Sequence, residues 1–370
     1  MNLIRMACPC HFGLESVLKF EVTKIGGQDI TVSDGKVSFS GDFSTLAKAN
    51  LWLATAERVL VQLAEFDAFT FEELFQGTKN IPFEDFIGAT DRFPVKGYSL
   101  NSELHSVPDC QSIIKKAAVE RLKGAYGISW FEETGALFQI QFSILKNHVT
   151  VYLDSSGAGL HKRGYRRNSN AAPIKETLAA GIVDLAHIRG DSIVCDPFCG
   201  SGTILIEAAY KALNIAPGLK RRFASDSWGV IPSEIWAAER QNALDAIRKD
   251  TDFFAYGYDI DPECVALTQE NCRKAGIQKR VQIRQADVRD YVNEENMITV
   301  CNPPYGERLG SIREARELYK KLGKTLSGLV PPWQMYLLTS EEEFEKLHGL
   351  DHFVINCVKY GKHISHYSLE

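Results

Sequence analysis

The alternation of apolar and polar residues divides the chain into two parts with different patterns. Before about residue 155, the short apolar runs ALFQIQFSI (136–144) and VTVYLD (149–154) predict strands, and DCQSIIKKAAVERLKGAYG (109–127) predicts a long helix. After about residue 190, apolar runs alternate with glycine turns and helical stretches, which is the pattern of a parallel α/β sheet. The sequence therefore predicts an α+β part followed by an α/β part.

Four apolar runs in the second part predict four strands, each of which ends on an aspartate or an asparagine. They are SIVCD (192–196), FFAYGYD (253–259), VQIRQAD (281–287) and MITVCN (297–302), and WQMYLLTS and HFVINCVKYG predict later strands. Pro173 is a favoured first-turn residue and predicts the start of the helix that leads into the first of them. Because the carboxyl ends of parallel strands share one edge of a sheet, the polar ends predict a binding crevice there.

Composition and charge narrow the class of protein. The 370 residues suffice for two domains, and 45% hydrophobic with 24% charged residues is typical of a globular protein. The apolar runs are too short to cross a bilayer and MNLIRMACPC is neither a signal nor a transit peptide, so we expect a cytoplasmic location and no membrane partner. Nine scattered cysteines predict neither a disulfide framework nor a metal site. The net charge of -5 does not exclude a nucleic-acid partner, since a basic stripe can lie on an acidic body.

The stretch DPFCGSGT (196–203) follows a strand and opens a helix, a setting in which glycines let backbone N–H groups approach a ligand. It lacks the third glycine of the dinucleotide fingerprint and the lysine of a P-loop, so a phosphate ligand is poorly supported. Asp259, at the end of the next strand, is placed to accept both hydroxyls of a ribose. Asp287 could accept from the exocyclic amine of a purine, between apolar walls formed by Ile260 and Val288.

These motifs resemble the class I S-adenosylmethionine-dependent methyltransferases, whose order and spacing DPFCGSGT, GYDID, QADVRD and CNPPYGERLG follow. The resemblance implies a Rossmann-like domain with a seven-stranded, mostly parallel sheet and S-adenosylmethionine as the cofactor. The chain departs from the family by a longer segment at 214–252, which we interpret as an insertion with one helix from about Ser233. This leaves the choice of the ribose partner between Asp259 and Asp261, and Asp259 is favoured because it ends the strand. The residues expected to bind the cofactor are Asp196, Pro197, Phe198, Cys199, Gly200, Ser201, Gly202, Thr203, Asp259, Ile260, Asp287 and Val288.

The resemblance also implies that NPPY (302–305) is the signature of amino-group methyltransferases. The side-chain oxygen of Asn302 and the carbonyl of Pro303 would each accept one N–H of an exocyclic amine, which aims the nitrogen lone pair at the methyl group. The prolines would hold these acceptors, and Tyr305 would stack on the flat substrate. The expected catalytic residues are therefore Asn302, Pro303, Pro304 and Tyr305.

The segment FPVKGYSLNSELHSVPDCQSIIKKAAVERLKGAYG resembles a THUMP domain, an RNA-binding module, preceded by a ferredoxin-like segment. We expect the ferredoxin-like segment at 1–60, the THUMP domain at 61–157, a basic linker with a leading helix at 158–190, and the methyltransferase domain at 191–370. Lysines and an arginine on the THUMP helix could contact phosphates, although a solvated helix face explains them equally well.

The linker adds cations together with His161 and Tyr165, a mixture of charge for phosphates and an aromatic ring for a splayed base. The residues expected to bind RNA are Lys96, Lys115, Lys116, Lys162, Arg163, Arg166 and Arg167.

Over nearly the whole chain the resemblance is closest to THUMP-containing guanine-N2 methyltransferases of bacterial large-subunit ribosomal RNA. It implies methylation of N2 of a guanine in 23S rRNA. The alternatives are a tRNA guanine-N2 or adenine-N6 methyltransferase, a protein-glutamine or DNA-amine methyltransferase, or a non-catalytic RNA-binding factor. The intact NPPY argues against the last of these, and the choice between a monomer and a weak dimer stays open.

Overall fold

The structure is a computed structural model that describes residues 3–166, 173–290, 296–304, 317, 320–321, 333–339, 353–358 and 362–369. The chain divides into two compact units, and each unit combines segments that are separate in the sequence. The first unit comprises residues 1–9, 19–160 and 221–241, and the second comprises 10–18, 161–220 and 242–370. In the described part of the chain, no helix is both long and apolar enough to span a membrane.

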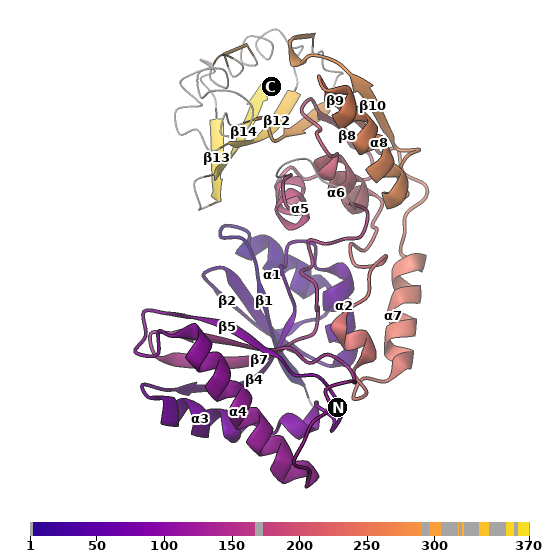
Figure 1. Cartoon of the computed structure of the whole chain (residues 1–370). Helices are drawn as coiled ribbons and strands as arrows, with labels where there is room; N and C mark the ends of the chain where they lie inside the picture. Colours follow the sequence, from indigo (N-terminus) through magenta and orange to yellow (C-terminus); the bar gives the residue numbers. More distant parts are fainter. Residues whose placement is uncertain are drawn as a thin grey trace. The chain divides into compact units, whose positions relative to one another are not determined.

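The first unit is built on one seven-stranded sheet (Figure 1). Its strands are β1 (Ile4–Pro9), β2 (Gln28–Ser33), β3 (Lys36–Gly41), β4 (Leu60–Asp67), β5 (Val95–Leu100), β6 (Ile140–Leu145) and β7 (His148–Asp154). They lie in the order β2-β3-β1-β4-β7-β6-β5, and all neighbours are antiparallel except the parallel pair of β5 and β6. Strand β4 pairs with β1 through Met6 and Val61 and with β7 through Val61 and Leu153. The ferredoxin-like and THUMP segments therefore share one sheet.

The helices of the first unit include α1 (Glu15–Lys24), α2 (Phe43–Trp52), α3 (Phe71–Lys79) and α4 (Val107–Tyr126), and α1 extends into the second unit. A capping box between Thr70 and Glu73 starts α3, because each residue satisfies a backbone N–H of the other. Gly127, in the left-handed conformation at φ 66°, ends α4. Helices α3 and α4 pack together over the same face of the sheet (Figure 1). The helix predicted over 109–127 is confirmed by α4.

The segment at 214–252, which the sequence analysis interprets as an insertion, contains the predicted helix as α7 (Ser233–Asp245). Its middle part, residues 221–241, belongs to the first unit. The Trp228 ring is buried and stacks on Phe138, with ring centroids 4.6 Å apart and planes at 16°. Its Nε1–H donates to the carbonyl of Leu137 at 3.0 Å. Residues 221–241 are therefore an integral part of the core of the first unit.

The second unit is built on another seven-stranded sheet. Its strands are β8 (Ile193–Asp196), β9 (Phe254–Asp259), β10 (Val281–Gln285), β11 (Met297–Cys301), β12 (Trp333–Thr339), β13 (Phe353–Val358) and β14 (Lys362–Leu369). They lie in the order β10-β9-β8-β11-β12-β14-β13. The first five are parallel and β14 is antiparallel to both neighbours. This confirms the expected seven-stranded, mostly parallel sheet, although no pattern in the sequence predicted β14.

The helices described in the second unit include α5 (Glu176–Leu185), α6 (Thr203–Ala212) and α8 (Pro262–Ala275), and α6 packs against both of the others. Helix α5 begins at Glu176, not near Pro173 as predicted. Lys175 has an extended backbone, and the carbonyl of Ile174 accepts from the Arg166 guanidinium at 3.4 Å instead of entering the helix.

Candidate active site

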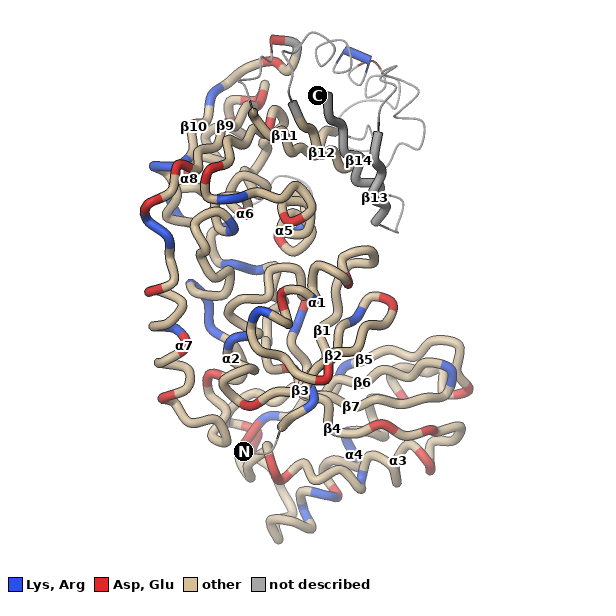
Figure 2. Tube along the Cα trace, turned by 180° about the vertical axis from the view of Figure 1, so that it is seen from behind, with Lys and Arg blue, Asp and Glu red and all other residues tan. Residues whose placement is uncertain are grey.

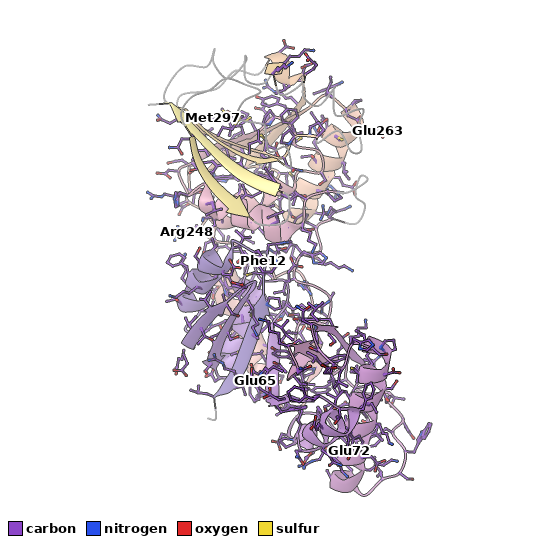
Figure 3. All side chains as sticks on the ribbon, turned by 90° about the vertical axis from the view of Figure 1, so that its left-hand side faces the viewer. Phe12, Glu65, Glu72, Arg248, Glu263 and Met297 are labelled. Carbon is purple, nitrogen blue, oxygen red and sulfur yellow. The ribbon has the colours of Figure 1, made fainter. Side chains whose placement is uncertain are left out.

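The predicted crevice lies at the carboxyl edge of the second sheet, where the adjacent parallel strands β9, β8 and β11 end. Strand pairing sets Asp196, the last residue of β8, beside Gly257, so that Asp259 ends β9 two residues further on. Asn302 follows β11 directly. Figure 3 shows Glu263, in the first turn of α8 after β9, and Met297, at the amino end of β11, on opposite sides of this unit. The sheet topology therefore brings Asp196, Asp259 and Asn302 to one edge.

The turn at residues 197–202, called the glycine turn below, connects β8 to α6. Gly200 and Gly202 have φ angles of 53° and 76°, which L side chains adopt only with strain. A Cβ at Gly202 would also lie 2.6 Å from the Thr268 side chain, so only glycine fits there. Gly257 on β9 serves the packing of the same region, because a Cβ there would lie 2.6 Å from Leu205.

Helix α8 fastens the glycine turn through two side chains that the sequence analysis missed. The Thr268 hydroxyl donates to the carbonyl of Gly200 at 2.7 Å, and the Asn271 amide donates to the carbonyl of Ser201 at 2.9 Å. Both residues are buried. Two buried polar residues three positions apart on one helix face are the signal that could have revealed them.

The Asp259 carboxylate binds the glycine turn and keeps capacity for a ligand. One oxygen accepts from the backbone N–H of Gly200 at 2.9 Å and the other from that of Asp261 at 3.0 Å. Each oxygen retains a further lone pair. The Asp261 carboxylate instead caps α8 by accepting from the N–H of Glu263 at 2.8 Å. This difference favours Asp259 over Asp261 as the ribose partner.

Asp196 is buried beneath the glycine turn. One oxygen accepts from the N–H of Phe198 at 3.0 Å. Burial, with a smaller contribution from the charge of Asp259, raises the pKa of Asp196 to about 8. At neutral pH the side chain is therefore largely protonated, and Asp259 is the acid at this edge that ends on the accessible side of the turn.

The described residues fit S-adenosylmethionine. A Cβ built on Gly200 meets nothing closer than the Phe198 carbonyl at 3.9 Å, so the turn leaves open space beside its backbone. Ile260 follows Asp259 and is 65% exposed, which provides an apolar surface for an adenine ring. Its carbonyl accepts from the Gln285 amide at 3.0 Å. Val288 is buried, and Asp287 lies two residues beyond the end of β10 because the pairing stops at Gln285 and Asp259. The strand predicted to end at Asp287 is therefore two residues too long.

The predicted catalytic residues lie at this edge as far as the structure describes them. Pro303 is buried, and Asn302 and Pro304 are partly exposed. Tyr305 lies outside the described residues.

The predicted RNA-binding residues of the linker are engaged inside the second unit. Arg163, 2% exposed, pairs with Glu207 of α6 at 3.5 Å, and the Tyr165 hydroxyl donates to the same carboxylate at 3.0 Å. Burial raises the pKa of Glu207, which the charge of Arg163 opposes. Arg166 pairs with Glu176 at 2.7 Å.

The prediction that Arg163 and Tyr165 contact RNA is therefore wrong, because neither side chain reaches solvent. Arg166 is held in an internal ion pair, whereas Lys162 is exposed. Arg167 lies outside the described residues.

Cations and acids are interleaved on the THUMP helices α3 and α4 (Figure 2). The Lys115 ammonium lies 2.6 Å from a Glu133 oxygen and 3.5 Å from the centre of the Phe93 ring, so it is engaged within the unit. Lys96 on β5 and Lys116 on α4 are exposed, and neither has an ion pair among the described residues. These two lysines fit the predicted phosphate contacts better than Lys115 does.

A parallel sheet of this order, with a glycine turn after its first strand and an acid at the end of its second, defines a class I S-adenosylmethionine-dependent methyltransferase. The family described as RMKL-like, methyltransferase domain, matches residues 163–366. The RlmL ferredoxin-like domain matches residues 5–60 and the THUMP domain matches 68–154. The chain belongs to the RMKL-like methyltransferase family and uses S-adenosylmethionine.

The chain is 46% identical to YpsC of Bacillus subtilis strain 168, named as a proposed RNA methyltransferase, over 94% of this chain and 91% of that protein. It is 32% identical to the ribosomal RNA large subunit methyltransferase K/L of Psychromonas ingrahamii, over 92% of this chain but 47% of that protein. The chain thus spans about half the length of this K/L relative. A solved structure of SMU.472, a proposed methyltransferase in complex with SAH, is 35% identical with a TM-score of 0.91, over 99% of this chain and 98% of that one.

Proposed function

We propose that this protein transfers a methyl group from S-adenosylmethionine to an exocyclic amine of an RNA base, and that the base is a guanine of 23S rRNA methylated at N2. The proposal rests chiefly on the position of Asn302, Pro303 and Pro304, which follow β11 at the edge where the glycine turn and Asp259 lie.

The chemistry of an exocyclic amine explains these residues. Its nitrogen is a poor nucleophile, because the lone pair is delocalised into the ring. The Asn302 side-chain oxygen and the Pro303 carbonyl are acceptors that can each take one N–H, which leaves the lone pair exposed. S-adenosylmethionine supplies an electrophilic methyl group when bound. Holding the amine in this orientation can lower the barrier by several kcal/mol, on the order of 7 to 11 at best.

A general base is not required in this scheme, since the amine proton becomes acidic as the nitrogen forms its new bond. Pro303 cannot rotate about φ and is buried, so the acceptor carbonyl is held in a fixed place. A polar acceptor pair on a rigid turn suits a planar amine better than a hydroxyl or a carbon nucleophile. This preference supports amino-group methylation.

The RNA part of the proposal is supported by the THUMP match and by the names of the relatives. YpsC is named for RNA, and the K/L relative for large-subunit ribosomal RNA. The exposed Lys96 and Lys116 in the THUMP segment can contact phosphates. The choice of guanine N2 over adenine N6 rests on the family resemblance, since both are planar amines that need the same two acceptors.

The test is mass spectrometry of 23S rRNA nucleosides from cells with and without the protein. We expect N2-methylguanosine at one or more positions to disappear without the protein and to return with the wild-type chain. Asn302→Ala should not restore it, whereas the matched control Asn80→Ala, at an exposed residue in the first unit, should restore it. Loss of N6-methyladenosine instead would show that the base is wrong. In vitro, label transferred only to DNA or to polypeptide would overturn the RNA proposal.

A further inference from the structure

A chain of polar side chains runs from the linker to the glycine turn inside the second unit. Arg166 donates from Nη2 to the Glu176 carboxylate at 2.7 Å and from Nη1 to the Thr203 hydroxyl at 3.4 Å. The hydroxyls of Thr203 and Ser201 lie 3.0 Å apart. Glu176, Thr203 and Ser201 are buried, so these interactions are shielded from water.

The direction of the hydrogen bonds in this chain follows from its first member. A guanidinium can only donate, so the Thr203 oxygen accepts from Arg166. The single hydroxyl hydrogen of Thr203 is then donated to the Ser201 oxygen, its other hydrogen-bond contact among the described residues. As a result, the hydroxyl hydrogen of Ser201 is directed away from Thr203.

The other polar groups of the turn around Ser201 already have partners. The carbonyl of Ser201 accepts from Asn271 and that of Gly200 from Thr268, and the N–H of Gly200 donates to Asp259. The Ser201 hydroxyl is therefore the side-chain donor of the turn that the network leaves for a ligand. It lies beside the first residue of α6, where the helix dipole favours an anion.

We infer that Arg166 and Thr203 are positioning residues that hold the Ser201 hydroxyl as a hydrogen-bond donor to the carboxylate of the amino-acid moiety of S-adenosylmethionine. That carboxylate is the anionic group of this cofactor at neutral pH. The inference depends on cofactor binding at the glycine turn, which the proposed function also uses, and does not depend on the identity of the methylated base.

This arrangement assigns the linker a role other than the predicted RNA contact. Arg166 connects the backbone that leaves the first unit to α5, through Glu176, and to the start of α6, through Thr203. Arg163 and Tyr165 anchor the same short stretch of linker to Glu207, further along α6. The linker thereby fixes the helix whose first residue orients Ser201.

Two ligands separate this role from a general effect on folding. SAH carries the amino-acid carboxylate, whereas 5′-methylthioadenosine has the same adenosine and thioether but no amino-acid moiety. The affinities of both are measured by titration calorimetry on the full chain. Ser201→Ala removes the terminal donor, Thr203→Val breaks the chain of hydrogen bonds while keeping the side-chain volume, and Thr203→Ser is the matched control that keeps the hydroxyl.

We expect Ser201→Ala and Thr203→Val each to weaken SAH binding about tenfold, which corresponds to about 1.4 kcal/mol. Binding of 5′-methylthioadenosine should change less than about twofold, and Thr203→Ser should bind SAH within about threefold of the wild type. Equal losses for the two ligands would mean that the substitutions merely deform the turn, and unchanged SAH affinity in Ser201→Ala would also overturn the inference.

Ser201→Ala touches neither the ion pair nor the helix packing, so it keeps the test decisive if Thr203→Val unfolds the chain. The outcome is independent of the proposed target. A protein that shows the SAH-selective loss but leaves 23S rRNA unmethylated would contradict the proposed function and still support the role of Ser201.

Discussion

Replacing Trp228 with alanine should destabilise the first unit, although this residue lies within the span matched by the methyltransferase family. The indole is 1% exposed, stacks on Phe138 and donates to the carbonyl of Leu137 at 3.0 Å. Replacing a buried tryptophan with alanine costs about 3–5 kcal/mol. In a unit of about 150–250 residues each kcal/mol lowers Tm by about 2–4 °C, so we expect a decrease of about 6–20 °C.

Trp228→Phe separates the two contributions. The phenyl ring can still stack on Phe138, but the carbonyl of Leu137 loses its indole donor. This loss should cost about 1–3 kcal/mol, so the decrease in Tm should be clearly smaller than for alanine. Leu244→Ala, at a 49% exposed residue of α7 in the second unit, is the control and should change stability by less than about 0.5 kcal/mol.

Scanning calorimetry with and without SAH identifies which unit is affected. SAH stabilises only the unit that binds it, by about 2.7 kcal/mol at a concentration one hundred times its Kd. Trp228→Ala should lower the transition that SAH does not raise. A decrease confined to the SAH-responsive transition would refute the assignment of residues 221–241 to the first unit.

The same feature determines how RNA binding must be tested. A fragment from residue 161 onward would carry Trp228 and Phe223 without the first-unit residues that bury them, such as Phe138. We expect such a fragment to expose apolar surface and to aggregate. Substitutions in the full chain are therefore the sound way to test the first unit.

Four further outcomes are expected. Asp259→Ala should weaken SAH binding more than about tenfold, or 1.4 kcal/mol, because both the ribose acceptor and the partner of Gly200 are lost, and an unchanged Kd would exclude Asp259 from the site. Asn302→Ala should abolish turnover while SAH affinity stays within about twofold, whereas equal losses of both would indicate a structural role. The pKa of Asp196, about 8 in the folded chain against 3.8 for the unperturbed group, means that the folded state binds more protons between these values. The stability contributed by this group is complete below about pH 4 and lost as pH rises through about 8, so the urea midpoint should fall over this range and Asp196→Asn should flatten the slope. Lys96→Gln and Lys116→Gln should each lower the salt slope of RNA binding by about one unit, and an unaltered slope would remove that lysine from the RNA surface.

Much of the second sheet and of the cofactor edge could be predicted from the sequence because the signals are local. The residues of β8 and the glycine turn are contiguous, and two glycines with positive φ follow directly from the need for a tight strand-to-helix connection. The polar ends of parallel strands meet at one edge whatever the details of packing, which is why Asp196, Asp259 and Asn302 could be grouped in advance.

The role of the linker cations could not be predicted in this way. A short basic stretch with an aromatic residue looks the same whether it faces RNA or an internal acid. Glu207, the partner of both Arg163 and Tyr165, lies 42 residues beyond the tyrosine on a helix whose pattern is largely apolar. Whether a cation is buried in an ion pair or exposed to solvent depends on the packing of such distant residues.

The sequence by itself determined the order of the strands, the glycine turn and the residue types at the candidate site, because these depend on backbone geometry over a few residues. Only the tertiary structure decided that β4 joins two segments into one sheet and that residues 221–241 complete the first unit. It also decided that Arg166 serves the cofactor turn. Each of these depends on contacts between residues far apart in the chain, whose free energy no local pattern records.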